Sequence, residues 1–304
     1  MRPPALIYQS VEKSYNGVRA LDSVSLEIQQ GEIFGLIGPD GAGKTSLIRM
    51  AMGIIAPDKG EVVLLGGKPS QTRNHAGYVA QSFSLYTQMT VMENIRLFGA
   101  LYGGQAEVLL SRSEDILRRT RLWKFRDRYA GALSGGMKQK LALASGLVHT
   151  PAILFLDEPT TGVDPVARRE FWAILYELNR EGLTIVVSTP YMDEADLCTR
   201  MLFLYRGQGL DQGTTKELLS RYPHQILEVN VADRKIRSAF REIPTVLDAN
   251  LFGTRYHLEV PNVREAIPQI RGLLCSKGYD DVEIRPLAPS LEDLFVSFAR
   301  KDAV

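Results

Sequence analysis

The amino-acid sequence predicts an α/β fold followed by a smaller α+β domain. Two observations predict the α/β part: a glycine-rich loop lies between an apolar strand and a helix, and further buried-type strands alternate with helical patterns. A third observation is the change of pattern after about residue 222, where short strands and helices follow in a new order. We therefore expect a larger domain over 1–222 and an accessory domain over 223–304.

Charge and composition exclude several classes of protein. The chain has 36 Lys and Arg against 35 Asp and Glu, so bulk electrostatics give no reason to expect nucleic acid as a partner. The two cysteines lack metal-like spacing and suit a reducing compartment. No apolar run approaches the roughly 18 residues that span a bilayer, and the first residues lack the apolar stretch of a signal peptide. We expect a cytoplasmic protein whose link to a membrane comes through a partner.

The first residues, 5–28, read as short strands with a turn at Asn16–Gly17. Tyr15 comes just before this turn. An aromatic side chain here could belong to the hairpin core, or it could stack on an adenine ring. The residues alone leave both roles open.

The glycine-rich loop, GPDGAGKTS, spans 38–46 and has the form G-x-x-x-x-G-K-[ST]. An apolar run precedes it and a helix-like run follows, as in a phosphate-binding P-loop. Backbone N–H groups of such a loop face the phosphates, Lys44 adds a positive charge for the β- and γ-phosphates, and the Thr45 hydroxyl is placed to bind Mg²⁺. The predicted nucleotide contacts are Gly38, Gly41, Ala42, Gly43, Lys44, Thr45 and Ser46.

After the P-loop helix, a strand over 62–65 and a short strand over 76–81 are expected. The second ends at Gln81, which could be an ordinary solvated residue or could reach Mg²⁺ or the attacking water. From about 84 to 132 the apolar residues recur at helical spacing, and helices are expected over 90–102, 105–120 and 123–129. These helices form an inserted helical subdomain.

Two further motifs follow. LSGGMKQ, at 133–139, opens a helix that we expect over 139–149; it is either a capped helix start or a second phosphate-binding device. In FLDEP, at 155–159, a buried-type strand ends in two acids: Asp157 would hold the Mg²⁺ hydration shell and Glu158 would polarise the attacking water. Acids at a strand end can also be surface residues. Asp164 lies in the next loop, before a helix over about 167–181 and a strand over 183–189.

Taken together, residues 5–220 resemble the ATP-binding subunits of ABC transporters, because Tyr15, the P-loop, Gln81, LSGGMKQ, FLDEP and Asp164 occur in the family's order. The resemblance implies a β-subdomain, a RecA-like core and a helical subdomain, with ATP and Mg²⁺ as ligands. It implies that Tyr15 stacks on adenine, that Lys44, Gln81 and Glu158 serve catalysis, and that Thr45, Gln81 and Asp157 hold Mg²⁺. Such subunits form head-to-tail dimers, so the nucleotide of the opposite P-loop is expected to be contacted by Ser134, Gly135, Gly136, Gln139 and Asp164.

One position departs from the family's pattern. After the strand that ends in Ser188–Thr189 the family usually has a histidine that touches the γ-phosphate, and this chain has Pro190. Thr189 as N-cap and Pro190 as first helical residue would make a good helix start, but proline offers neither that side chain nor a backbone N–H. Loss of a polar group at the transition state commonly costs about 100-fold or more in rate. We therefore predict slow hydrolysis at this chain's own P-loop.

Pro190 also affects which dimer partner we expect for this chain. A homodimer is possible and would lack the histidine at both sites; we favour a heterodimer in which a second ATPase subunit supplies a complete site. The chain also looks like the first ATPase half of tandem two-ATPase exporters. The resemblance implies integral membrane permease subunits as partners and a place on the cytoplasmic face of the cell membrane, and it does not reveal the transported substrate.

Two other classes of ATP-binding protein share part of this pattern. DNA-repair or chromosome-structure ATPases share the signature, but they carry coiled coils or zinc modules between the P-loop and the signature, and this chain has neither heptads nor cysteines there. A non-hydrolysing regulatory ATP-binding module is the other alternative, motivated by Pro190. Intact Lys44, Asp157 and Glu158 argue against it.

The tail after residue 223 predicts the order βαββαβ, which is typical of a ferredoxin-like domain. Strands are expected over 224–231, 246–251, 255–260 and 282–285, and helices over 232–243 and 263–276. A last helix starts at Ser290 with the sequence SLEDLF. The ending resembles the C-terminal extension of daunorubicin-resistance-type exporter ATPases, and its role is not readable from the sequence.

Overall fold

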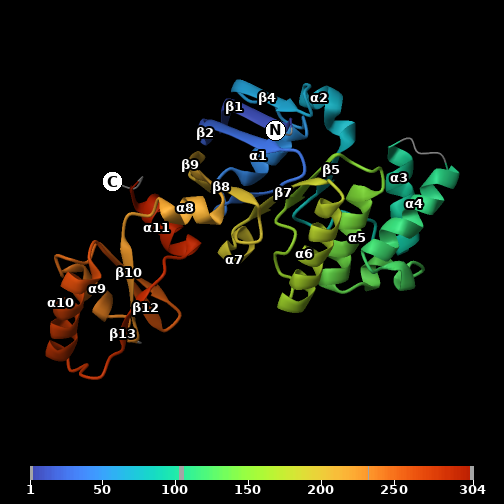
Figure 1. Ribbon diagram of the computed structural model, residues 1–304. Coiled ribbons are helices and arrows are strands. Elements are labelled where there is room, and N and C mark those ends of the chain that lie inside the picture. The colour runs from blue at the N-terminus through green and yellow to red at the C-terminus, as the bar shows by residue number, and fades with distance from the viewer. Residues whose placement is uncertain (1–2, 103–105, 232, 302–304) are drawn as a thin grey trace. The chain divides into compact units, whose positions relative to one another are not determined.

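A computed structural model describes residues 3–102, 106–231 and 233–301 (Figure 1). The chain divides into two compact units, Met1–Thr214 and Thr215–Val304. The predicted helices that start at Gln105 and Ala232 both begin outside the described residues. Within the described ranges, no helix has both the length and the hydrophobicity needed to cross a bilayer. The predicted domain boundary after residue 222 stays a prediction.

A six-stranded sheet forms the centre of the larger unit. Its order is β5-β6-β7-β3-β8-β9, with β9 antiparallel to β8 and all other neighbours parallel. The strands are β3 (Ile33–Ile37), β5 (Ala76–Val79), β6 (Ile153–Asp157), β7 (Thr184–Thr189), β8 (Arg200–Tyr205) and β9 (Gln208–Gly213). Strands β3, β6 and β7 are buried along their whole length, which is why they read as continuous apolar runs. The carboxyl ends of these three strands therefore lie side by side.

Alternate side chains of the central strands enter two hydrophobic cores, one on each face of the sheet. Phe155 packs with α1 (Lys44–Ala51) and with the three-stranded sheet, whereas Leu156 packs with α5 (Gly135–Leu147) and α6 (Pro165–Arg180). Helices α5 and α6 run next to each other in Figure 1. The P-loop between β3 and α1 is thereby fixed at both of its ends by buried elements.

The three-stranded antiparallel sheet has the order β2-β1-β4. Its strands are β1 (Pro4–Tyr15), β2 (Val18–Gln29) and β4 (Lys59–Leu64). The turn at Asn16–Gly17 is confirmed, and both residues have positive φ, 50° and 82°, as a tight hairpin turn requires. The expectation of several short strands is wrong: β1 and β2 are 12 residues each, and irregular register bends one continuous hairpin.

The helical insertion contains α3 (Val91–Leu101) and α4 (Ala106–Arg119). Thr90 and Glu93 form a capping box at the start of α3. The prediction of a helix over 123–129 is wrong, because only a 3₁₀ turn, Trp123–Phe125, forms. The following carbonyls are used elsewhere: the Arg126 and Arg128 oxygens accept hydrogen bonds from the first two N–H groups of α3. This segment therefore closes the insertion instead of continuing as a helix.

Shorter elements complete the larger unit. They are α2 (Pro69–Thr72), α7 (Met192–Ala195) and the 3₁₀ turns Arg73–His75 and Ala130–Ala132. The helix predicted from Gln139 starts earlier, at Gly135, because Ser134 caps it. The predicted cap at Thr189 is wrong: Thr189 is the last residue of β7, and α7 begins at Met192 with Tyr191 at the N-cap position.

The smaller unit contains a four-stranded antiparallel sheet of order β11-β12-β10-β13. Its elements follow as α8 (Thr215–Ser220), β10 (Gln225–Val229), α9 (Ile236–Arg241), β11 (Asp248–Phe252), β12 (Arg255–Val260), α10 (Val263–Ser276), β13 (Ile284–Leu287) and α11 (Leu291–Lys301). Helices α9 and α10 pack on one face of this sheet through a core that includes Phe240, Tyr256 and Ile270. From β10 to β13 this is the βαββαβ order that the sequence predicts.

Candidate nucleotide site

A cavity of about 340 Å³ lies over the P-loop, at the carboxyl ends of β3 and β6. Parallel sheets place ligand sites at this edge, where the loops that follow the strands meet. Four residues from outside the loop join its lining: Tyr15 from β1, Ala20 from β2, Gln81 after β5, and Glu158 after β6. The lining residues are Tyr15, Ala20, Asp40, Gly41, Ala42, Gly43, Lys44, Thr45, Ser46, Gln81 and Glu158.

Two glycines of the P-loop have no room for a side chain. A Cβ on Gly38 would lie 2.2 Å from the Leu204 carbonyl oxygen, and one on Gly43 would lie 2.6 Å from Leu21 Cδ2. Gly43 also has a φ of 106°, a conformation that residues with a Cβ rarely adopt. The loop therefore needs glycine at both positions to bring its backbone against the neighbouring strands.

Lys44 is folded back over the P-loop. Its Nζ donates to the carbonyl oxygens of Gly38 (2.7 Å) and Pro39 (3.0 Å) and lies 3.1 Å from Glu158 Oε1. The side chain is only 3% exposed, and a charge so deeply buried requires partners of this kind. An anion that enters the cavity would replace Glu158 as the charged partner of Lys44.

The two acids after β6 face different partners. Asp157 accepts hydrogen bonds from Thr45 Oγ1 (3.1 Å) and from Ser188 Oγ (2.6 Å). Glu158 Oε2 accepts from Gln81 Nε2 at 2.9 Å. Glu158 has a φ of 50°, a strained conformation for a residue with a Cβ, and strain of this kind is concentrated at functional sites. The backbone thus turns Glu158 toward the cavity while Asp157 stays beneath Thr45.

The oxygen atoms in this site suit Mg²⁺. A hydroxyl from Thr45, a carboxylate from Asp157 and an amide from Gln81 are hard ligands of the type that Mg²⁺ prefers. Tyr78 lies on the far side of Asp157, with its hydroxyl 3.5 Å from Oδ2. Burial, reinforced by the Asp157 charge, raises the pKa of Tyr78, so the phenol stays neutral beside the carboxylate.

The residues of LSGGMKQ lie on a different part of the larger unit and do not line the cavity. The exposed Ser134 caps α5 by accepting a hydrogen bond from the Met137 N–H. A Cβ on Gly136 would lie 2.7 Å from the Ala167 Cβ of α6, whereas one on Gly135 would meet nothing within 4 Å. The exposed Asp164 caps α6 through the N–H groups of residues 166 and 167. Ser134, Gly135 and Asp164 are therefore exposed, and they lie outside the cavity over this chain's own P-loop.

Pro190 follows the residue that touches the start of the P-loop. The Thr189 carbonyl oxygen accepts a hydrogen bond from the Gly38 N–H at 3.3 Å. Pro190 is half-buried and is not part of the cavity lining.

Sequence reasoning missed Ser188, which links the two acids. Its hydroxyl donates to Asp157 and accepts from the Glu158 N–H at 3.0 Å. Its place at the carboxyl end of a buried strand next to β6 was the available signal. Asp40 and Ala20, which line the cavity, carried no such signal.

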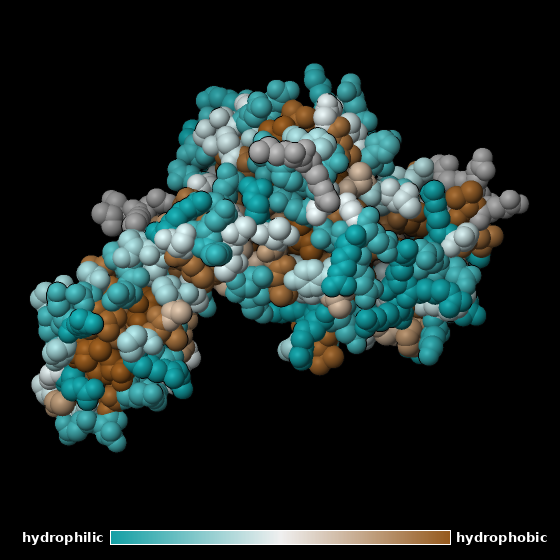
Figure 2. Space-filling model, viewed as in Figure 1, coloured by the Kyte–Doolittle hydropathy of each residue, from teal (hydrophilic) through white to brown (hydrophobic). Residues whose placement is uncertain are grey.

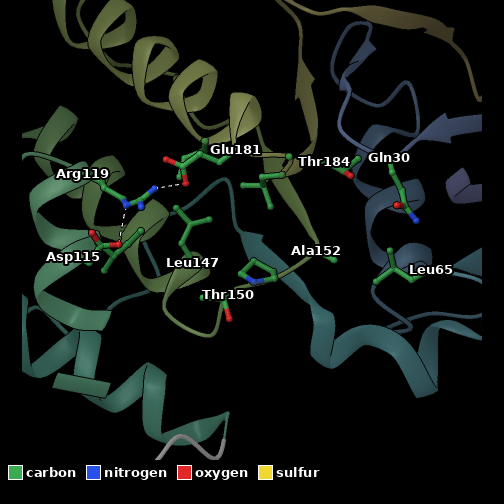
Figure 3. A pocket seen from close by; sticks show the side chains of 14 residues that line it. Gln30, Leu65, Asp115, Arg119, Leu147, Thr150, Ala152, Glu181 and Thr184 are labelled. Atoms are coloured by element: carbon green, nitrogen blue, oxygen red, sulfur yellow. Dashed lines mark hydrogen bonds and ion pairs between the residues drawn. The ribbon is translucent and has the colours of Figure 1, made fainter. Parts of the chain in front are cut away.

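Another cavity, of about 480 Å³, lies at the opposite edge of the sheet, where β6 and β7 begin. Figure 3 shows Arg119 of α4 in this cavity, bonded to Asp115 and Glu181. The side chain of Arg119 is thus matched by two carboxylates, and no glycine-rich loop contributes to the lining. This cavity lacks the features of a phosphate site.

Comparison with known proteins defines the class. The family model described as ABC transporter matches residues 21–161. The chain is 33% identical to the Nod factor export ATP-binding protein I of Rhizobium sp. (strain N33), with 99% of each chain covered. It is 37% identical to the probable multidrug ABC transporter ATP-binding protein YbhF of Escherichia coli (strain K12), over 97% of this chain and 52% of the relative. The chain thus spans about half the length of that relative.

Solved structures agree. The structure of cbiO1 from Clostridium perfringens, part of the ABC transporter complex cbiONQ, has a TM-score of 0.67 and 27% identity, over 79% of this chain and 96% of that one. A bacterial ABC transporter cassette in a dimeric structure has a TM-score of 0.64 and 27% identity, over 69% of this chain and 98% of that one. The chain belongs to the ATP-binding proteins of ABC transporters. The α/β fold that the sequence predicts, with a P-loop ATPase core, is confirmed.

Proposed function

We propose that this chain is the ATP-binding and hydrolysing subunit of an ABC-type exporter and drives a separate membrane permease. One observation carries the proposal: around the cavity over the P-loop, Lys44 and Gln81 contact Glu158, Thr45 contacts Asp157, and Ser188 links the two acids into one network. These residues combine a phosphate-binding cation, a candidate Mg²⁺ site and an acid that faces the γ-phosphate end of the cavity.

Each group has a distinct task in this proposal. Tyr15 stacks on the adenine at the outer rim; it is 41% exposed and its hydroxyl lies 3.4 Å from Ser46 Oγ. The P-loop N–H groups and Lys44 bind the phosphates. Mg²⁺, when bound by Thr45, Asp157 and Gln81, neutralises charge on the β- and γ-phosphates. Glu158, released from Lys44, orients and polarises the attacking water.

We propose that hydrolysis at this P-loop is slow, since Pro190 cannot donate a hydrogen bond to the γ-phosphate. The separate location of Ser134, Gly135, Gly136, Gln139 and Asp164 supports a head-to-tail dimer in which they contact the nucleotide of the opposite subunit. A heterodimer with a complete partner ATPase is favoured, because this chain can then supply an intact signature to a fast site. A homodimer is the alternative arrangement.

Export through a membrane permease is supported by the relatives, which are named for multidrug transport and for Nod factor export. Figure 2 shows apolar side chains at the ends of α3 and α4 in the helical insertion. Leu101, Val108 and Leu110 are exposed there, at 71%, 42% and 47%. Such a patch on the helical insertion suits contact with an apolar partner surface, and it would hold the chain peripherally on the cytoplasmic face of the membrane.

A non-hydrolysing regulatory module is the second candidate, favoured by Pro190 alone.

Equilibrium ATP binding and sedimentation test the lead proposal. We expect Lys44→Ala to abolish binding of a fluorescent ATP analogue, and Pro190→His to leave the dissociation constant within about twofold, since residue 190 lies outside the cavity lining. Binding that persists in Lys44→Ala would contradict the P-loop site. Glu158→Gln with MgATP should stay monomeric if a different partner is required, and dimerise if a homodimer forms.

A further inference from the structure

Glu194 is a buried carboxylate that the nucleotide site does not contact. It lies in α7, four residues after Pro190, and is 1% exposed. It does not line the cavity over the P-loop. A carboxylate so deeply buried is costly unless several donors are aimed at it, and its partners therefore show what it is for.

Both of its oxygens are used. Oε1 accepts hydrogen bonds from the Thr160 hydroxyl and from Trp172 Nε1 at 3.3 Å, and it lies 3.5 Å from Arg168 Nε. Oε2 accepts from the Thr189 hydroxyl at 2.7 Å. The four partners come from three separate segments of the chain: the loop after β6, helix α6 and the end of β7.

Two of these segments adjoin the nucleotide site, and the third, α6, begins beside Asp164. Thr160 lies two residues after Glu158 in the same loop. Thr189 precedes Pro190, and its carbonyl oxygen holds the first N–H of the P-loop. Arg168 lies on α6, which begins beside Asp164, and its guanidinium also covers the Tyr191 ring at 4.6 Å and pairs with Asp193.

We infer that Glu194 is a positioning residue for ATP hydrolysis, which fixes the segment around Pro190 and the loop that carries Glu158 in one arrangement. The inference rests on the proposed function, because it concerns the same reaction. Glu194 does not line the cavity, and it acts through Thr160 and Thr189. A catalytic group displaced by about 1 Å can lose about 100-fold in rate, so these two bonds control the step that follows nucleotide binding.

Glu194→Gln is the sharpest substitution. The glutamine keeps the size of the side chain and can still accept from Thr160 and Trp172 through its oxygen. Its amide N–H₂ group can only donate, so the Thr189 O–H, which now donates to Glu194 Oε2 at 2.7 Å, loses this acceptor. The substitution therefore removes the acceptor for Thr189 and the charge opposite Arg168, without leaving a cavity.

Glu32→Gln is the matched control. Glu32 is also a buried carboxylate, 7% exposed, and it pairs with Arg200 at 3.2 Å. It precedes β3 and so lies at the amino edge of the sheet, away from the nucleotide cavity. Both variants lose one buried carboxylate with an arginine partner, and only Glu194→Gln should affect hydrolysis.

The test measures MgATP turnover and ATP-analogue binding in the full chain, in the wild-type and Pro190→His backgrounds. We expect Glu194→Gln to lower kcat about 10-fold or more, with KM and the dissociation constant within about twofold. Glu32→Gln should leave kcat within about twofold, even if it lowers the melting temperature as much as Glu194→Gln does. An equal effect of the two variants on kcat, or a loss of binding in Glu194→Gln, would overturn the inference.

Trp172 gives a readout that does not need turnover. In a Trp123→Phe background it is the remaining tryptophan. We expect MgATP to change its emission, and Glu194→Gln to abolish that change while the analogue still binds. An unchanged response in Glu194→Gln would refute the inference. If neither the wild type nor Pro190→His hydrolyses ATP, the proposed function fails, and the Trp172 response still decides whether Glu194 links the nucleotide to α6.

Discussion

The two adjacent glycines of LSGGMKQ allow a packing role to be separated from a role in nucleotide contact. Gly135 and Gly136 are the first two residues of α5. A Cβ on Gly136 would lie 2.7 Å from the Ala167 Cβ of α6, closer than real Cβ contacts come, whereas a Cβ on Gly135 meets open space. We therefore predict that Gly136→Ala destabilises the larger unit relative to Gly135→Ala.

The size of the difference follows from the packing. An extra carbon in a close helix contact costs about 1–3 kcal/mol in unfolding free energy. Replacement of glycine by alanine in a helix raises the unfolding free energy by up to about 1 kcal/mol, and both variants share this stabilisation. The difference between them is therefore about 1–3 kcal/mol in unfolding free energy. For a unit of this size, each kcal/mol shifts the melting temperature by about 2–4 °C.

The assay is thermal and denaturant unfolding followed by tryptophan fluorescence, since both tryptophans, Trp123 and Trp172, lie in the larger unit. Equal stability of Gly135→Ala and Gly136→Ala would refute the tight contact between α5 and α6. ATP hydrolysis of the assembled dimer adds the second readout. If the proposed contact with the opposite nucleotide is right, Gly135→Ala lowers hydrolysis although it does not destabilise the chain.

Two further predictions concern titration and reactivity. Burial alone would raise the pKa of Asp293, but hydrogen bonds from His257 and Ser290 outweigh it and hold this pKa below its usual value. A lowered native pKa stabilises the smaller unit above the unfolded value of about 3.9, and this stabilisation is lost as the pH falls through the native value. The protection factors of the β12 amides, corrected for intrinsic exchange, should therefore fall in acid, and less steeply in Asp293→Asn. Cys198 is buried, which raises its pKa, whereas Cys275 is exposed. A disulfide reagent at neutral pH should modify one thiol in the native chain and two after unfolding, and rapid modification of both would contradict the burial of Cys198.

Much of the fold could be predicted because its central strands are buried on both sides. The runs at 33–37, 153–157 and 184–189 are mostly apolar and are buried at every position, and the motifs at their carboxyl ends mark the same edge of one sheet. The βαββαβ order of the tail was equally visible, down to the bounds of α10. Local patterns decide these elements, so the sequence alone sufficed.

The errors arose where distant contacts decide the structure. Residues after Phe125 look helical, but their carbonyls bond to the start of α3, a contact that no local pattern shows. The Thr189–Pro190 pair looks like a helix start, but the Thr189 hydroxyl is engaged by Glu194 and the Tyr191 N–H. The roles of Ser188 and Glu194 were missed for the same reason, since each acts by joining segments that are far apart in the sequence.

We propose that this chain carries an ATP site that lacks one catalytic part, the donor to the γ-phosphate that Pro190 cannot supply. The most direct measurement is ATP hydrolysis by the purified chain with Mg²⁺, in parallel for the wild type, Pro190→His and Glu158→Gln. We predict weak wild-type turnover that rises by up to about 100-fold in Pro190→His and vanishes in Glu158→Gln. Robust wild-type turnover that Glu158→Gln abolishes would contradict the claim, because the site would then be complete without a histidine at position 190.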